Sequence, residues 1–456
     1  MTETITPELP EAARAPGSGQ LLRVLGGVFG LAIAVGATVG GGILRTPGEI
    51  AAALPSAALI MAVWVFGGAI TLLGANSFSE LGAMMPSAGG PYVYARRAFG
   101  DGIAFFVGYA DWINWCLGPV VLVLIVGEYM GGLFPALAGH ALVVDFVTLG
   151  VLVTLQWIGV RSGGRTQEIT TALKAAALVA LVIAAFTLPH AELAATPTVV
   201  PHGASLLIAL GVAMQGVIFT YDAYYAVVYC GEEVRDPGRE IPRSMFRGVG
   251  LIILIYLVVN LAYLAVVPVG RMAGDPFVAA TMATAIFGPR GDTIIRLIMI
   301  VSVLGAINAQ LMAVPRILLA MSRDGLFPRQ AGRVNRGGTP SVALGLSVVV
   351  VVGFLLSGSF TFVLAFDAIL IVVMYAISFS SLFVLRHREP DAPRPFRAVG
   401  YPVLPALALL VAIGLTVAMS VSDWRSALVV LAILVLSWPA SRLVRRLMRQ
   451  PPVSRR

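Results

Sequence analysis

Long apolar segments recur along the whole chain and restrict its fold more than any other feature. About twelve can be distinguished, and most have close to the roughly 20 residues with which an α-helix crosses the hydrocarbon core of a bilayer. They cover residues 24–44, 57–78, 103–134, 141–160, 169–188, 204–230, 249–269, 294–321, 342–356, 360–385, 403–421 and 427–444. The mean hydropathy is +0.90 and only 12% of the residues are charged, which is typical of a protein surrounded by lipid. The sequence therefore predicts a polytopic membrane protein.

The pattern within the apolar segments favours helices over barrel strands. A transmembrane barrel strand alternates apolar and polar residues, and these segments do not. Because a backbone in hydrocarbon must satisfy its own hydrogen bonds, only helices and closed barrels span membranes. We therefore expect an all-α protein with about twelve transmembrane helices. Cys116 and Cys230 both fall inside apolar segments, which argues against a disulfide framework.

Arginine carries almost all of the positive charge, and its distribution predicts the orientation. Of 31 basic residues only Lys174 is a lysine. With a cytoplasmic N-terminus, 24 arginines fall in inner segments, five lie near the outer side, and Arg316 lies within the eighth apolar segment. This bias predicts that both termini are cytoplasmic, with residues 1–22 as a disordered tail and 449–456 as a second tail. We expect a bacterial inner-membrane protein whose charge of +8 serves topology and anionic headgroups, not nucleic acid.

Four glycines interrupt the first apolar segment at a depth where a helix should be continuous. The segment reads GATVGGGI from Gly36 to Ile43. In a bilayer, unpaired backbone groups are tolerated only where they line a cavity or meet a ligand. Close helix packing is the alternative for Gly36 and Gly40, which have GxxxG spacing, but it does not require Gly41 and Gly42. We therefore expect an unwound stretch that forms a binding site.

The sixth apolar segment contains a second interruption. It reads FTYDAYY from Phe219 to Tyr225, so an acid and three tyrosines stand in an aliphatic run. A carboxylate such as that of Asp222 is costly inside a membrane unless it has a partner. Interruptions in the first and sixth spans are typical of inverted repeats of five helices. The predicted organisation is a first repeat at residues 23–188, a second at 189–388, and two further spans at 389–448.

Several short motifs follow one another in a specific order. They are GATVGGGI at 36–43, PSAGGPY at 86–92, the pairs Tyr221-Asp222 and Glu232-Glu233, RDPGREIP at 235–242, SRDGLFP at 322–328 and RPFR at 394–397. With these motifs the chain, from about Leu21 to about Leu404, resembles the amino acid–polyamine–organocation superfamily and looks closest to bacterial relatives of the L-type amino acid exchangers. Two positions depart from the family pattern: Gly41, where relatives often have a hydroxyl or another small residue, and Asp222, where many have glycine.

The resemblance implies a leucine-transporter-like fold that holds its substrate between broken helices 1 and 6 and alternates access to either side. The implied function is secondary transport of an amino acid, most simply a small or neutral one, by exchange or proton coupling and not by sodium. A polyamine or cationic amino acid is the alternative substrate. A membrane-embedded enzyme or a channel is less favoured, because no metal-ligand motif and no filter repeat occur. We expect no cofactor, no metal and no obligate protein partner.

The two interruptions suggest how a zwitterion is held. Its carboxylate would meet backbone N–H groups at the positive end of a half-helix, near Gly40 to Gly42, and its ammonium would meet carbonyls near Val35, Gly36 and Phe219. Asp222 either contacts the ammonium or caps the second half of helix 6. The predicted substrate-binding residues are Gly36, Ala37, Thr38, Gly40, Gly41, Gly42, Phe219, Tyr221 and Asp222.

Lys174 is the single lysine and lies inside the fifth apolar segment. The resemblance implies that it stands where sodium-coupled members of the fold hold a sodium ion, so that its ammonium substitutes for that ion. The alternative is a lysine whose head group snorkels to the inner headgroups.

Other polar residues inside the spans are candidates for gates or for structural pairs. The possible gate or cavity residues are Tyr224, Tyr225, Asp111, Glu232 and Glu233. Because a helix C-terminus disfavours carboxylates, Glu232 and Glu233 are expected to pair with an arginine such as Arg96 or Arg97. For Asp111, Glu128, Arg316 and Asp367, we favour structural pairing within the bundle.

Overall fold

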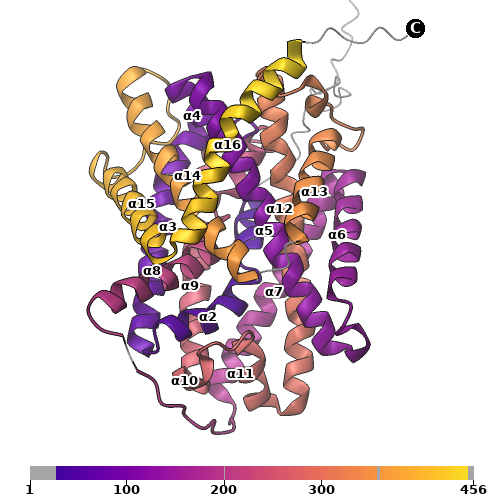
Figure 1. Cartoon of the computed structure of the whole chain (residues 1–456), viewed down its shortest axis with the longest axis vertical. Coiled ribbons are helices and arrows are strands. Elements are labelled where there is room, and N and C mark those ends of the chain that lie inside the picture. Colours follow the sequence, from indigo (N-terminus) through magenta and orange to yellow (C-terminus); the bar gives the residue numbers. More distant parts are fainter. Residues whose placement is uncertain (1–26, 200, 357–359, 450–456) are drawn as a thin grey trace, which may run out of the picture.

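The computed structural model describes residues 27–199, 201–356 and 360–449 of the chain, so the predicted tail at 1–22 and nearly all of that at 449–456 lie outside the described residues. The described part is built from α-helices joined by short 3-10 helices (Figure 1). The elements are α1 Gly27–Thr38, α2 Gly42–Ala53, α3 Ala57–Met84, α4 Pro91–Phe99, α5 Asp101–Leu133, η2 Pro135–Leu137, α6 Ala141–Ile158, α7 Val160–Thr187, α8 Ala204–Tyr221, η3 Ala226–Glu233, α9 Pro237–Val266, α10 Val269–Met272, α11 Val278–Phe287, α12 Pro289–Arg323, η4 Arg329–Gly332, α13 Ser341–Leu355, α14 Phe360–Arg388, α15 Val403–Ser422 and α16 Trp424–Arg449. The predicted all-α class is confirmed.

The number of membrane-crossing helices agrees with the sequence. Within the described ranges, 11 helical segments are long and apolar enough to cross a bilayer. The predicted ninth span corresponds to α13, which has only 15 residues. A helix that rises 1.5 Å per residue needs about 20 residues to cross the hydrocarbon, so α13 is too short to be counted among the 11. With α13 added to these 11, the set numbers twelve. The boundaries of the two predicted repeats are not tested and stay a prediction.

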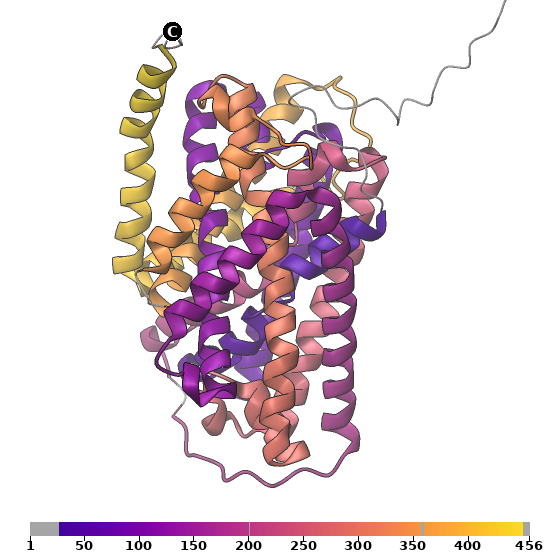
Figure 2. The ribbon, with the colours of Figure 1, turned by 90° about the vertical axis from the view of Figure 1, so that its right-hand side faces the viewer.

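The bundle has a buried centre and an apolar outer surface. Helix α1 with α2, and helices α5, α12 and α14, are largely buried, whereas α6, α15 and α16 expose most of their apolar side chains. Val147, Val421 and Leu431 are among the exposed ones, at 61%, 70% and 55%. Figure 2 shows α16 running along one flank of the bundle. Apolar side chains so exposed would be unfavourable in water and are expected against lipid.

The two ends of the bundle differ in what caps them. Both ribbon views place α10, α11 and the connection before α8 at one end, and α4 with the C-terminal end of α16 at the other (Figures 1 and 2). The second end carries arginines such as Arg97 and Arg323, in α4 and at the end of α12. This is the end that the arginine count predicts to be cytoplasmic.

Both predicted helix interruptions are present. The first helix is divided into α1 and α2 by Val39, Gly40 and Gly41, and the sixth into α8 and η3 by residues 222–225. The first break is shorter than we expected, because Gly36 is still part of α1. In the second break Ala223 has a φ of +66°, a left-handed conformation that is uncommon for a residue with a side chain.

Close packing accounts for part of the glycine run. A Cβ atom on Gly40 would lie 2.9 Å from the Ala306 Cβ, and one on Gly41 would lie 2.6 Å from the Ile125 Cδ1. The helix break and the close packing are therefore both present. The glycines interrupt the helix, and their lack of side chains allows α12 and α5 to pack closely against its backbone.

A second close approach joins α2 to the segment between α10 and α11, at the end of the bundle opposite α4. The Gly274 N–H donates to the Gly48 carbonyl over 3.0 Å, and a Cβ on Gly48 would lie 2.0 Å from the Asp275 carbonyl oxygen. Because the obstacle is backbone, it cannot rotate away as a side chain can.

We predict that Gly48→Ala lowers the free energy of unfolding by about 1–3 kcal/mol through overpacking, measured as a lower thermal midpoint of the detergent-purified protein. The matched control is Gly414→Ala in α15, where nothing lies within 4 Å of the added methyl group. That variant should be unchanged or more stable by up to about 1 kcal/mol, because alanine is the better helix former. Equal midpoints for the two variants would contradict the packing described here.

Candidate functional site

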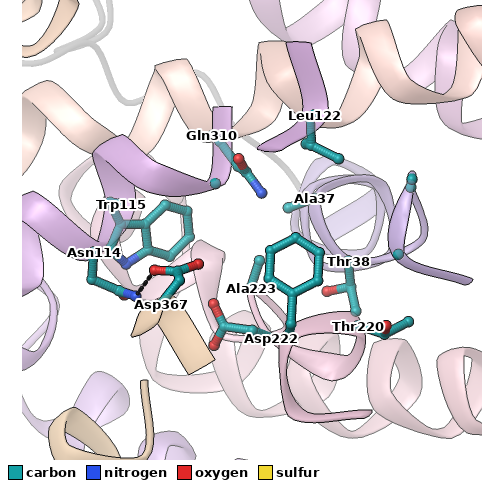
Figure 3. A pocket seen from close by; sticks show the side chains of 15 residues that line it. Ala37, Thr38, Asn114, Trp115, Leu122, Thr220, Asp222, Ala223, Gln310 and Asp367 are labelled. Atoms are coloured by element: carbon teal, nitrogen blue, oxygen red, sulfur yellow. Dashed lines mark hydrogen bonds between the residues drawn. The ribbon is translucent and has the colours of Figure 1, made fainter. Parts of the chain in front are cut away.

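A cavity lies between the two helix breaks at the centre of the bundle (Figure 3). Its volume is about 30 Å³, enough for about two water molecules if each needs about 10–15 Å³. It is lined by Ala37, Thr38, Gly40, Gly41, Gly42, Asn114, Trp115, Gly118, Leu122, Phe219, Thr220, Asp222, Ala223, Gln310 and Asp367. Residues far apart in the chain, from α1, α2, α5, α8, α12 and α14, therefore meet at one point.

The structure brings seven of the nine predicted substrate-binding residues to this cavity. Gly36 and Tyr221 are the two that do not line it. The Gly36 carbonyl accepts a hydrogen bond from Lys174 Nζ over 2.6 Å, and the Tyr221 hydroxyl donates to the Trp64 carbonyl over 3.1 Å. Gly36 lies in the helical part of α1, and Tyr221 ends α8 with its ring facing α3, so contact of these two residues with a substrate stays a prediction.

The first break presents the start of α2 to the cavity. Gly40, Gly41 and Gly42 all line the cavity, and α2 begins at Gly42. The first N–H groups of a helix have no partner within it, and the helix dipole places partial positive charge there. An anionic group entering the cavity would therefore be stabilised at this wall.

The carbonyl ends of α1 and α8 share one hydroxyl group from α9. The Tyr256 hydroxyl lies 2.7 Å from the Thr38 carbonyl oxygen and 2.8 Å from the Thr220 carbonyl oxygen. The hydroxyl groups of Thr46 and Thr220 are 2.9 Å apart and link α2 to α8. The two breaks are thus tied together behind the cavity. Nothing in the local sequence around Tyr256 signals this role.

Lys174 reaches the first break from α7. Its side chain is 1% exposed, and Nζ donates to the carbonyls of Gly36 and Val39. A cation at the C-terminal end of a helix is favoured by the helix dipole, so the ammonium stabilises the end of α1. A snorkelling lysine would place its head group at the headgroup level, whereas this one is buried at the break.

Two carboxylates enter the cavity from different helices. Asp222 follows α8, and its Oδ1 accepts a hydrogen bond from the Tyr375 hydroxyl over 2.7 Å. Asp367 lies in α14, and its Oδ1 accepts from Asn114 Nδ2 over 2.7 Å. The expected pairing of Asp367 is found, but the residue also lines the cavity. The cap position of η3 is Tyr225, with no side-chain cap hydrogen bond, so Asp222 does not cap the second half of helix 6.

The tyrosines after Asp222 point away from the cavity. Tyr224 and Tyr225 are fully buried and pack with Phe78 and Tyr375; the rings of Phe78 and Tyr225 are stacked with centroids 4.6 Å apart. They therefore belong to an aromatic core beside the cavity and do not line it, and a role for them as a gate stays a prediction. Of the aromatic residues in FTYDAYY, only Phe219 lines the cavity.

Asp111 also lies outside the cavity lining. Both of its carboxylate oxygens are 2.9 Å from the Tyr229 hydroxyl, and its side chain is fully buried. It pairs α5 with η3, as expected for a structural role.

The glutamates at the end of η3 pair with arginines of α12. Arg316 holds Glu233 at 2.5 Å, and both side chains are buried. Arg323 holds Glu232 at 2.7 Å, where each side chain is about one-third exposed. Glu232 Oε1 also accepts the Ala88 N–H over 3.1 Å.

The arginines that we expected as their partners are engaged elsewhere. Arg96 pairs with Asp101 and Asp324, at 2.8 Å and 2.6 Å, and Arg97 pairs with Glu389 at 2.6 Å. The prediction was wrong because α12 packs directly against η3, which places its own arginines nearer to the glutamates.

No group of three or more His, Cys, Asp or Glu side chains in the described ranges is placed to hold a metal ion. The cavity therefore offers hydrogen-bonding groups, a helix start and two carboxylates, a set that suits a small polar organic ligand.

Comparison with known proteins agrees with this geometry. Residues 26–438 match the family model described as amino acid permease. The serine/threonine exchanger SteT of Bacillus subtilis is 26% identical over 85% of this chain and 89% of its own length. The human b(0,+)-type amino acid transporter 1 is 24% identical, with 92% of this chain and 88% of the relative covered. For the human large neutral amino acids transporter small subunit 2 the values are 27%, 85% and 74%. The chain therefore belongs to the amino acid permease family, as its motifs predicted.

Proposed function

We propose that this protein moves an amino acid across the membrane by alternating access, through exchange or proton coupling and without sodium. The observation that carries the proposal is the central cavity, which lies between two broken helices and is walled by the start of α2. A substrate at such a point is reached from either side when the two halves of the bundle move against each other. The named relatives, among them a serine/threonine exchanger, support transport of amino acids over an enzymatic role.

The substrate carboxylate is assigned to Gly40, Gly41 and Gly42. The backbone at these residues lines the cavity and precedes a 12-residue helix, so it supplies N–H groups and the positive end of a dipole. The ammonium needs acceptors on the opposite wall. The Gly36 carbonyl is engaged by Lys174 and the Val35 carbonyl by the Val39 N–H, so we assign the ammonium to Asp222.

Lys174 is the group that we propose in place of a coupling sodium ion. Its ammonium is held by two carbonyls at the end of α1, and carbonyls freed by a broken helix are the ligands that such folds offer to sodium. A tethered ammonium group at this position stabilises the break in the absence of sodium. Transport should then proceed equally well in sodium-free buffer.

We predict that Lys174→Ala lowers substrate uptake into proteoliposomes by about tenfold or more, because hydrogen bonds to a charged group are worth about 1.5–3 kcal/mol each. The matched control is Leu173→Ala, the neighbouring residue on the same helix, which is 54% exposed and should leave uptake unchanged. Uptake, exchange and pH dependence that all match the wild type in Lys174→Ala would overturn the role.

The pair Glu232–Arg323 is proposed as the closure at the cytoplasmic end. It joins η3 to the end of α12, and Glu232 also holds the loop before α4 through Ala88. Because the pair is partly exposed, water can solvate the two charged groups when they separate. The Arg316–Glu233 pair is buried, so its charges would separate without solvation. We therefore propose that the first pair opens and the second stays closed. The cytoplasmic assignment of this end, of both termini and of the bacterial inner membrane rests on the arginine distribution.

Cys230 offers a native reporter of that closure. It precedes Glu232 in η3 and is fully buried. We predict that Glu232→Gln speeds maleimide labelling of Cys230 in inside-out vesicles by about two- to fivefold, since a pair of this exposure is worth about 0.2–1 kcal/mol. Glu240→Gln, which breaks an ion pair within α9, is the control and should not change the rate. Equal labelling rates in both variants would show that the pair is not a gate.

A further inference from the structure

The cavity is lined by acidic side chains that have no basic side chain beside them in the described part of the chain. Two carboxylates, Asp222 and Asp367, line it, and no basic side chain is among the lining residues that the structure describes. Lys174 is committed to the carbonyls at the end of α1. Asp367 is 2% exposed, so its ionised form is far from bulk water and is favoured only when a counter-charge is bound beside it.

The groups that hold the two carboxylates are neutral. Asn114 donates to Asp367 and Tyr375 donates to Asp222. Such donors fix the direction of a carboxylate, but they do not neutralise it. Both acids are therefore oriented and still lack a cation.

Other polar atoms in the cavity lack partners too. Thr38 is 5% exposed, and its Oγ1 has no hydrogen-bond partner within the described residues. Gln310 Oε1 is also buried without a partner. Figure 3 shows the side chains of both residues directed into the cavity. Buried polar groups are usually satisfied in folded proteins, and these two belong to residues that line the cavity beside the acids, so they are available to a polar ligand.

The two acids define two separate positions at which a cationic group of a substrate could bind. Figure 3 shows Asp222 between Asp367 and Thr38, with Asp367 close to Asn114 and Trp115. An α-ammonium held by Asp222 and Thr38 leaves the α-carboxylate near the glycines of the first break. The second carboxylate, Asp367, then faces the side chain of the substrate.

We propose that Asp367, held by Asn114, binds an amino or guanidino group at the end of the substrate side chain, so that the substrate is a cationic amino acid. This rests on the proposed function, because it takes the carboxylate to lie at the glycines. Trp115 lines the same part of the cavity and provides an aromatic surface for a guanidinium ion. Binding requires the cavity to widen, as alternation of access between its two sides would allow.

A neutral substrate is favoured by the sequence because the interruption of the sixth span is rich in aromatic residues, and of Phe219, Tyr221, Tyr224 and Tyr225 only Phe219 lines the cavity. The wall opposite the first break is acidic instead.

Arginine and citrulline make a matched pair of probes, since they have similar length and citrulline is uncharged. We expect the wild-type protein in proteoliposomes loaded with a mixture of unlabelled arginine and neutral amino acids to take up labelled arginine about tenfold or more faster than citrulline. Agmatine, which is arginine without the α-carboxylate, tests the other end of the site and should be taken up about tenfold or more slowly than arginine.

Asp367→Asn should lower arginine uptake by about tenfold or more and change citrulline uptake by less than about twofold, so that the preference is lost. The matched control is Asp391→Asn, an exposed residue in the connection after α14, which should keep the wild-type preference. If Asp367→Asn fails to fold, Asn114→Ala, which removes the donor that orients Asp367, tests the same site and should also reduce the preference for arginine over citrulline.

The outcomes separate the two levels of the argument. Uptake of neutral amino acids with no uptake of arginine would overturn the role of Asp367 and leave the proposed function standing. Agmatine transported as well as arginine would support the cation site and overturn the assignment of the carboxylate to the glycines. No uptake of any amino acid, with the protein folded by thermal unfolding, would overturn the proposed function itself.

Discussion

The structure depends on how the chain satisfies backbone hydrogen bonds in hydrocarbon. An unpaired N–H or C=O group there costs several kcal/mol, and this chain interrupts two helices at the centre of its bundle. The freed groups are not left without partners. The Lys174 ammonium donates hydrogen bonds to carbonyls at the end of α1. The Tyr256 hydroxyl lies within hydrogen-bonding distance of the Thr38 and Thr220 carbonyls, near the ends of α1 and α8. Polar atoms of Thr38 and Gln310 that line the cavity have no partner within the described residues, so part of the binding site consists of groups that the fold does not satisfy itself.

The buried charges divide into two kinds by their partners. Arg316 with Glu233, and Arg386 with Glu80, join oppositely charged side chains at the end of the bundle that carries α4. Pairs of this kind fix the relative position of helices, although burying them brings little net stability. Among the described residues, Asp222 and Asp367 have only neutral donors, as does the fully buried Asp111, which accepts from the Tyr229 hydroxyl. Asp222 and Asp367 differ from Asp111 because they line the cavity, so it is their position together with the lack of a charged partner that marks them as groups able to meet a ligand.

Local patterns in the sequence predicted the features that depend on neighbouring residues. The run from Gly36 to Ile43 contains four glycines, which are enough to predict a break in the helix. Lys174 is recognisable because the other thirty basic residues are arginines. The partners across the bundle were beyond this reasoning. Asn114 and Asp367 are separated by 253 positions, and no periodicity in either helix specifies that they meet.

The direction of side chains at the second break was equally beyond local reasoning. Residues 222–225 are not helical, and a helical period cannot say where the side chains of such a stretch point. Tyr224 and Tyr225 were therefore placed in the cavity, and they pack into an aromatic core. The partners of Glu232 and Glu233 were missed for a related reason, since they depend on how α12 packs against η3.

The phenol of Tyr256 has one proton and two carbonyl acceptors at almost equal distance. It completes one of these bonds only by weakening the other, so the ends of α1 and α8 compete for the same donor. A displacement of either half-helix would therefore strengthen one bond and weaken the other, so the positions of the broken ends of helices 1 and 6 are coupled through one hydroxyl group.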